Sequence, residues 1–195
     1  MAEAASARRT RITSEREAEL YMSVLDLLRE VGYDALTMDA VAARTRSSKA
    51  TLYRQWGGKA ELVAGAIRQQ EPAASGINTG SLRGDFYAVV TREDDVRIDQ
   101  NYALLRGLAT VVHENPDLLR ALRELIIEPE IEELREILGR ATERGEILPD
   151  NPAQGYLLHM LIGAFAVRSV IDQLPPTQSF LPSYIDAVVV PALGA

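Results

Sequence analysis

Apolar residues recur at intervals of three and four along most of the chain, which is the spacing of one face of an α-helix. The clearest such stripe consists of Leu20, Val24, Leu27, Leu28 and Val31. Ser14 precedes this stripe and has Glu17 three positions later, which is the pattern of a capping box. Gly32 follows the stripe, and glycine commonly ends a helix. The pattern therefore predicts a first helix over residues 14–31.

The same spacing predicts three further helices before residue 71, over residues 37–44, 48–56 and 59–70. Thr37 is a good N-cap for the first of them, and Ser47 or Ser48 can cap the second. Gly57 and Gly58 separate the second from the third, because adjacent glycines interrupt a helical pattern.

Residues 71–81 carry Pro, Gly, Ser and Asn without periodicity, and we expect them to connect two regions. Beyond them the spacing predicts helices over residues 82–94, 96–113, 116–144, 152–173 and 180–190. Pro129 is expected to interrupt the long helix, because proline removes a backbone hydrogen bond and clashes with the preceding turn. The predicted fold class is all-α, with about nine helices.

Composition narrows the class of protein. The chain of 195 residues is 47% hydrophobic and 25% charged, as in an ordinary soluble globule, and it has no cysteine. Disulfides, thiolate metal sites and cysteine nucleophiles are therefore excluded. The longest apolar run, Leu157–Val167, is about half the roughly 20 residues that a membrane span needs, and the first residues contain no apolar signal region. We expect a cytoplasmic protein with no membrane partner.

Charge is unevenly distributed along the chain. The net charge is −7, yet residues 1–70 hold 11 Lys and Arg against 9 Asp and Glu. Between residues 36 and 59, Asp39 is the one acidic residue beside five basic ones: Arg44, Arg46, Lys49, Arg54 and Lys59. This window suggests a polyanion-binding segment. On charge alone, a chance cluster on a solvated face is the favoured explanation.

The helices at 37–44 and 48–56 have the layout of a helix-turn-helix, in which the second helix presents its first residues to the DNA major groove. Leu52 and Trp56 lie one turn apart on the second helix, and we expect them to be buried. The opposite face presents a small residue, a hydroxyl and cations that suit base edges and phosphates, namely Ala50, Thr51 and Arg54, with Lys49 and Tyr53 on the flanks.

The stretch from Thr37 to Val63 closely resembles the DNA-binding domain of TetR-family transcriptional regulators. Its core is Ser48-Lys-Ala-Thr-Leu-Tyr-Arg-Gln-Trp56, followed by Lys59 and Leu62, and the strong resemblance covers about residues 14–68. Two later stretches, at 80–85 and 140–147, look like one branch of these regulators. The resemblance implies a flexible basic arm (1–13), a helix-turn-helix DNA-binding domain (14–70) and a ligand-binding and dimerisation domain (71–195).

The sequence departs from the family pattern at two places. Thr45-Arg46-Ser47 forms the turn where the family often has Ala-Gly-Val, so a glycine that would ease a positive φ is missing. Gly57-Gly58 replaces the more usual Pro-polar pair before Lys59, which weakens the cap below that lysine. Neither departure removes a side chain that the resemblance implies for DNA contact.

Carried over residue by residue, the resemblance implies base or groove contacts from Lys49, Ala50 and Thr51. It implies phosphate contacts from Tyr53 and Lys59, although Tyr53 could instead be a half-buried interface ring. Further DNA-contacting candidates are Thr37, Arg44, Arg46, Ser48, Arg54 and Gln55. Arg8, Arg9 and Arg11 could reach the minor groove or belong to a free tail.

The C-terminal region suggests a homodimer. Residues 157–167 place Gly163, Ala164 and Ala166 beside large apolar residues, which suits close helix approach. With residues 185–190 they could form a self-complementary interface, as the last helices do in the family, or ordinary core. The family also implies a small effector, largely apolar, held in this region. Candidate pocket residues, each also explained by core packing, are Phe86, Tyr87, Tyr102, Arg106, His113, Met160 and Phe165.

No enzyme, metal or cofactor motif is recognisable. His113 and His159 belong to no HExxH pattern, and no nucleotide-binding loop or GxSxG occurs. An acidic repeat could be a carboxylate array, but interspersed arginines favour a salt-bridged exposed face, with the repeat at Glu124, Glu128, Glu132 and Glu136. The predicted function is a ligand-responsive repressor that binds a palindromic DNA operator as a homodimer. The alternative is a helical carrier protein whose helix-turn-helix no longer binds DNA.

Overall fold

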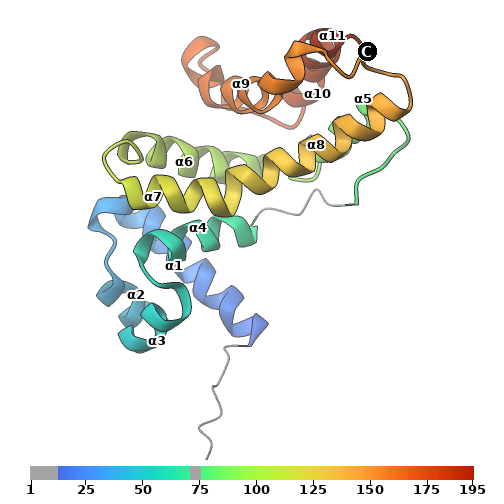
Figure 1. The fold of residues 1–195 in the computed structure, drawn as a ribbon. Coiled ribbons are helices and arrows are strands. Elements are labelled where there is room, and N and C mark those ends of the chain that lie inside the picture. Colours follow the sequence, from blue (N-terminus) through green and yellow to red (C-terminus); the bar gives the residue numbers. More distant parts are fainter. Residues whose placement is uncertain (1–12, 71–75) are drawn as a thin grey trace, which may run out of the picture.

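A computed structural model describes residues 13–70 and 76–195, and the predicted arm up to residue 12 lies outside these ranges. The helices are α1 (Ser14–Ala35), α2 (Met38–Thr45), α3 (Lys49–Trp56), α4 (Lys59–Gln70), α5 (Leu82–Val90), α6 (Asp95–Val111), α7 (Pro116–Leu122), η1 (Arg123–Ile127), α8 (Glu128–Glu143), η2 (Pro152–Tyr156), α9 (Leu157–Ile171), α10 (Phe180–Tyr184), η3 (Ile185–Val189) and α11 (Val190–Leu193). Because α7–η1–α8, η2–α9 and α10–η3–α11 are each continuous, the described residues form nine helices and no strand (Figure 1). The all-α prediction is confirmed.

Side-chain caps set the first helix boundaries. The Thr13 side chain accepts from the Arg16 N–H, so Thr13 caps α1, and the predicted capping box from Ser14 was wrong by one residue. Thr37 caps α2 at 3.2 Å as predicted, and Ser48 rather than Ser47 caps α3 at 3.1 Å. Gly32 has φ 76° and breaks the helical geometry, but another turn follows it before α1 ends.

The first core forms where α1 packs against α2 and α4. The predicted stripe is buried except for Val31, which is exposed. Leu52 is fully buried, and the Trp56 indole donates to the Tyr21 hydroxyl at 2.8 Å, so both face inward as predicted. The same core continues into α6 and α7 through residues such as Leu108 and Leu118. Helices α1 and α4 therefore rest directly on α6 and α7, the next layer of the molecule (Figure 1).

Pro129 does not break the long helix, although the sequence predicts an interruption there. The turn just before it, η1, is π-helical, and the Glu128 N–H bonds to the Arg123 carbonyl five residues back. A wider turn is a common way to absorb a local change in a helix's hydrogen-bond ladder, so the chain continues through the proline. The same arrangement recurs at η3, two residues before Pro191.

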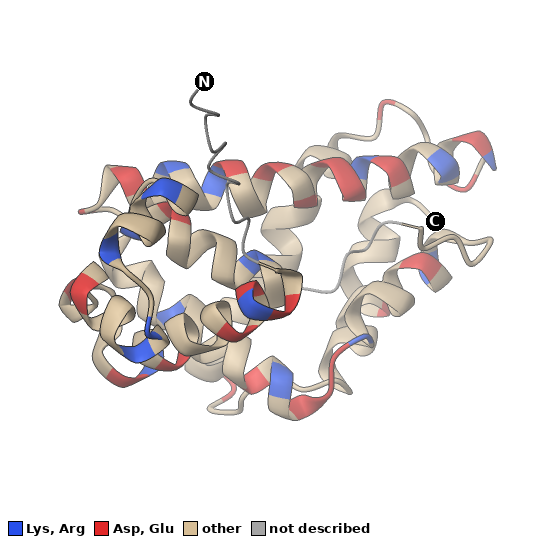
Figure 2. Ribbon diagram, turned by 90° about the horizontal axis from the view of Figure 1, so that it is seen from below, with Lys and Arg blue, Asp and Glu red and all other residues tan. Residues whose placement is uncertain are grey.

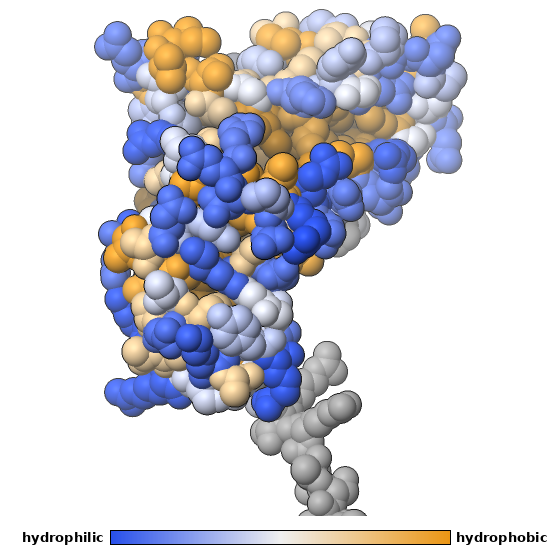
Figure 3. Space-filling view, turned by 60° about the vertical axis from the view of Figure 1, so that its left-hand side comes forward, coloured by the Kyte–Doolittle hydropathy of each residue, from blue (hydrophilic) through white to orange (hydrophobic). Residues whose placement is uncertain are grey.

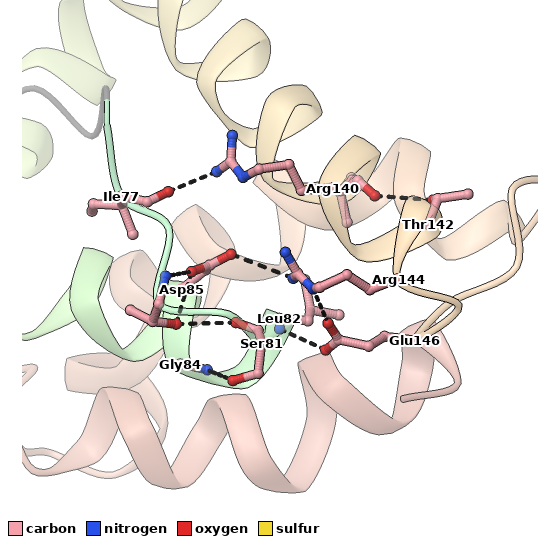
Figure 4. Close-up of polar contacts among 11 residues, drawn as sticks. Ile77, Ser81, Leu82, Gly84, Asp85, Arg140, Thr142, Arg144 and Glu146 are labelled. Carbon is pink, nitrogen blue, oxygen red and sulfur yellow. Dashed lines mark hydrogen bonds and ion pairs between the residues drawn. The ribbon is translucent and has the colours of Figure 1, made fainter.

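A second core joins α5, α8, α9 and the C-terminal helix. The Asp85 carboxylate is fully buried beside it and accepts from the Thr79 N–H at 2.6 Å, with Arg144 at 3.6 Å (Figure 4). Glu146 accepts from the Leu82 N–H at 2.6 Å and pairs with Arg144. The two family-like stretches, at 80–85 and 140–147, thus meet in one polar network that fastens the start of α5 to the end of α8.

The rest of the chain buries only a small part of helix α9. Leu157 is its one buried residue in the described structure, and Val167, Val170 and Ile171 are exposed. Among described residues, the segment Pro152–Ile171 is the one helix long and apolar enough to cross a membrane, by length and composition only. The other half of the predicted interface differs: Ile185 and Val189 are fully buried and belong to the chain's own core.

Candidate nucleic-acid interface

The turn between α2 and α3 is tight although it has no glycine. Arg46 adopts φ 51° and ψ 36°, the left-handed conformation that the family pattern would give to glycine. Its N–H bonds to the Ala43 carbonyl, and the Ser47 N–H bonds to the Ala42 carbonyl. These bonds end α2 with a left-handed cap. The missing glycine therefore does not prevent the helix-turn-helix geometry.

The first turn of α3 combines a fixed hydroxyl with a small exposed residue. The Ser48 Oγ accepts from the Thr51 N–H and lies 2.8 Å from the Thr51 hydroxyl. Ala50 is exposed beside them, and Leu52 points into the core. A surface without a bulky side chain here permits close approach of another molecule to the helix.

The basic residues of this region fall into two groups. Three are held by internal partners: Lys49 by Asp39 at 2.9 Å, Arg44 by Glu30 at 2.6 Å, and Lys59 by the Tyr33 carbonyl at 3.0 Å. The Lys59 ammonium also lies 4.1 Å from the centre of the Tyr33 ring. Arg46 and Arg54 are exposed and form no ion pair with any described residue. Basic and acidic positions consequently alternate over this end of the molecule (Figure 2).

The ion pairs shift the acidity of their members. The hydrogen bond from Arg44 lowers the pKa of Glu30, and the hydrogen bond to Asp39 raises the pKa of Lys49. Both shifts favour the charged forms of Glu30 and Lys49.

All eleven predicted DNA-contacting residues lie on α2, α3, the turn between them, or the immediate flanks. Thr51 and Lys59 are half-buried, and the other nine are exposed: Thr37, Arg44, Arg46, Ser48, Lys49, Ala50, Tyr53, Arg54 and Gln55. The structure thus gathers them at one end of the molecule, the end opposite α9 (Figure 1). Their contact with DNA stays a prediction.

Two family models match the chain. Residues 25–66 match the model for bacterial regulatory proteins of the tetR family, and residues 77–188 match the model for the tetracyclin repressor-like C-terminal domain. The chain belongs to the TetR family of transcriptional regulators. Both TetR-family models describe regulators rather than enzymes, as the sequence predicts.

TetR-family relatives align along nearly the whole chain. An uncharacterised HTH-type transcriptional regulator of Mycobacterium tuberculosis is 39% identical over 184 residues, which are 92% of this chain and 89% of that protein. A DNA-binding transcriptional repressor TetR of Mycobacteroides abscessus is 29% identical over 89% of this chain and 92% of its own length. The TetR-type fold is shared with a crystal structure of a TetR-family regulator from Rhodococcus sp., with TM-score 0.72, 18% identity, and coverage of 90% of this chain and 99% of that one.

A cavity of about 580 Å³ lies in the C-terminal region, between α4, α5, α6, the α7–α8 helix, α9 and α10. Most of its wall is apolar and comes from residues such as Ile98, Leu108, Ile126, Leu161 and Phe165. Hydrophobic surface is visible in the hollow beneath the top layer of the molecule in Figure 3. A wall of this kind suits a small apolar molecule.

Two of the seven predicted pocket residues, His113 and Phe165, line this cavity. Phe86 is buried in the second core, and Met160 packs against that core. The Tyr87 hydroxyl is bonded to Asp186 at 2.6 Å instead. The remaining two, Tyr102 and Arg106, do not line the cavity. Tyr102 packs edge-on against Phe165 and is hydrogen-bonded to Ser169, and the exposed Arg106 lies over the Tyr102 ring.

Sequence reasoning missed the polar residues of the wall other than His113, above all Glu130. Ile126, Glu130 and Leu134 are spaced four apart, and both apolar neighbours are buried, so the spacing itself places the carboxylate on the inner face. The predicted acidic repeat, in contrast, lies on the exposed face of the same helix, as expected.

Glu130 also connects the cavity with α4. Arg68, in the last turn of α4, donates to Glu130 at 3.0 Å and to Glu133 at 3.2 Å. Burial raises the pKa of the Glu130 carboxyl, and the neighbouring Glu133 carboxylate raises it further. Across residues 13–70 and 76–195, no three His, Cys, Asp or Glu side chains are placed to hold a metal ion.

Proposed function

We propose that this chain is a ligand-responsive transcriptional repressor that binds a palindromic DNA operator as a homodimer and acts in the cytoplasm. The observation that carries the proposal is the exposed face of α3, which begins at the Ser48 cap and presents Lys49, Ala50 and Thr51. A TetR-family repressor among the relatives supports the repressor role. A structural neighbour described as a flavonoid-responsive regulator supports the ligand response.

In this account α3 enters the major groove. Lys49, Ala50 and Thr51 meet base edges, since these residues are at the start of the helix where a helix-turn-helix reads sequence. Tyr53 and Lys59 contact backbone phosphates. Further contacts come from the remaining members of the group: Thr37, Arg44, Arg46, Ser48, Arg54 and Gln55.

The exposed apolar face of α9 supplies the dimer interface. Val167, Val170 and Ile171 would leave water when a second copy packs against them. A two-fold axis then places the two α3 helices about 34–36 Å apart, one turn of DNA, which matches a palindromic site.

A small, largely apolar effector occupies the cavity and favours a dimer geometry that fits the operator poorly. The Arg68–Glu130 contact offers a path from the cavity wall to α4. By linkage, operator DNA weakens effector binding by the same factor.

Two alanine variants test the base contacts. Lys49→Ala and Thr51→Ala are each expected to lose about 1–3 kcal/mol of operator affinity while the dimer persists, as measured by fluorescence anisotropy and sedimentation. Arg135→Ala, an exposed charge loss on α8, is the control and should bind like wild type. Wild-type operator affinity in Lys49→Ala would refute the contact assignment.

Phosphate contacts have a different signature. Tyr53→Phe and Lys59→Ala should weaken binding to every duplex, and Lys59→Ala should flatten the salt slope by about 0.9, the value for one phosphate contact. Because Lys59 also bonds the Tyr33 carbonyl, thermal unfolding must show that the variant is folded under the assay conditions. A salt slope identical to that of wild type would count against the contact.

A further inference from the structure

Two carboxylates hold two of the basic residues proposed to face DNA. Arg44 donates through both terminal nitrogens to Glu30, at 3.1 and 2.6 Å, and Lys49 donates to Asp39 at 2.9 Å. Both pairs are exposed, so another anion can reach them from solvent.

The geometry of these pairs matches the way the same cations bind phosphate. A guanidinium fork accepts a carboxylate or a phosphate in the same two-bond arrangement, and a lysine ammonium binds either as a point charge. Glu30 comes from α1 and Asp39 from the first turn of α2. Neither carboxylate can accept a hydrogen bond from Arg44 or Lys49 while a phosphate occupies the same donors.

We infer that Glu30 and Asp39 are built-in competitors that limit the affinity of the helix-turn-helix for the phosphates of duplex DNA. The inference rests on the proposed function, in which Arg44 and Lys49 contact DNA; on a duplex that lacks the operator bases, Lys49 meets a backbone phosphate instead of a base edge. Docking on any duplex must separate both pairs and leaves two carboxylates near the phosphate backbone. Arg46 and Arg54, which form no ion pair with described residues, remain available for first contact. The arrangement keeps the protein from binding random DNA tightly.

A purely structural role makes the opposite prediction. If the two pairs serve only to hold α2 against α1 and α3, neutralising the carboxylates loosens the domain and weakens DNA binding. If they compete with phosphate, neutralising them strengthens binding and makes it more sensitive to salt, because the repulsion between carboxylate and DNA disappears. The sign of the change therefore separates the two roles.

The experiment compares Glu30→Gln/Asp39→Asn with wild type on a labelled random duplex by fluorescence anisotropy at three salt concentrations. The double variant is expected to bind about 4- to 25-fold more tightly at low salt, since it removes two exposed ion pairs and each contributes about a 2- to 5-fold factor. Its salt slope should be steeper. The single variants Glu30→Gln and Asp39→Asn should each give part of the gain, and they keep the test decisive if the double variant unfolds.

Asp34→Asn is the matched control, because Asp34 is exposed near the end of α1 and forms no ion pair with a described residue. An equal gain in duplex affinity in this control would show that only the net charge of the protein matters, and would overturn the inference. So would unchanged or weaker binding in folded Glu30 and Asp39 variants while wild type binds the duplex. Wild type that binds no duplex in a salt-dependent way would overturn the proposed function, and this inference with it.

Discussion

Arg68 Nη1 lies 3.0 Å from Glu130 Oε1, so the last turn of α4 is bonded to a side chain of the cavity wall. Arg97 strengthens this junction by donating to the Gln70 carbonyl at the end of α4. A molecule bound in the cavity would therefore contact the same carboxylate that α4 contacts through Arg68. Ile67, the residue before Arg68, also lines the cavity, so α4 meets the cavity through both of these side chains.

The raised pKa of Glu130 predicts that the free energy of unfolding depends on pH. Because the folded pKa is above the unfolded value, Glu130 favours the folded state below the unfolded pKa, and that contribution is lost as pH rises through the folded pKa. Glu130→Gln removes this loss. The melting temperature of Glu130→Gln minus that of wild type should therefore be larger at pH 8 than at pH 4.

Calorimetry or circular dichroism at both pH values measures the difference. Glu132→Gln, an exposed change on the same helix, is the control and should follow wild type. A difference between Glu130→Gln and wild type that stays constant with pH would contradict the assignment.

The Asp85 network predicts a large stability loss. Asp85→Ala removes a fully buried carboxylate and leaves the Thr79 N–H without its acceptor, with Arg144 nearby. We expect about 1–3 kcal/mol less free energy of unfolding, the usual cost of leaving a buried hydrogen-bond donor without its partner. Urea denaturation measures it, and Asp150→Ala, at an exposed loop residue, should change little. A loss below 1 kcal/mol would show that the network is not holding α5 to α8.

Most of the fold follows from helical periodicity, because each of the first four helices buries one face against the others. The exceptions depend on contacts that a local pattern does not contain. Val31 continues the apolar spacing of α1, but Gly32 breaks the helix immediately after it and Val31 remains exposed. Pro129 is absorbed by a π-helical turn, which forms where the helix packs against α4.

The sequence predicts the DNA-facing surface of α3 better than it predicts the residues of the cavity. The inward face of α3 follows from the spacing of Leu52 and Trp56, so its outward face is known as well. The carboxylate partner of Arg44 is 14 positions away on another helix, and only the crossing of α1 and α2 brings it near. Pocket residues were harder still, because aromatic side chains such as Phe86 fill a core as readily as they line a cavity.

The α9 interface predicts a change of oligomeric state. Val170 is 79% exposed within the chain, and Val170→Glu would place a charge in the apolar face that a second copy covers. Sedimentation velocity should show a shift from dimer to monomer with unchanged helix content. Met22→Glu is the control, since Met22 is 55% exposed on α1, a helix that lies away from α9 (Figure 1). A dimer that withstands Val170→Glu would place the interface elsewhere.

Operator binding is tested by fluorescence anisotropy on a labelled duplex taken from the DNA upstream of the protein's own gene, at two salt concentrations. We expect salt-sensitive binding of two protomers per site that outcompetes random DNA. Absence of any salt-dependent binding, to this duplex or to random DNA, would contradict this expectation and favour a helical carrier protein that has lost DNA binding.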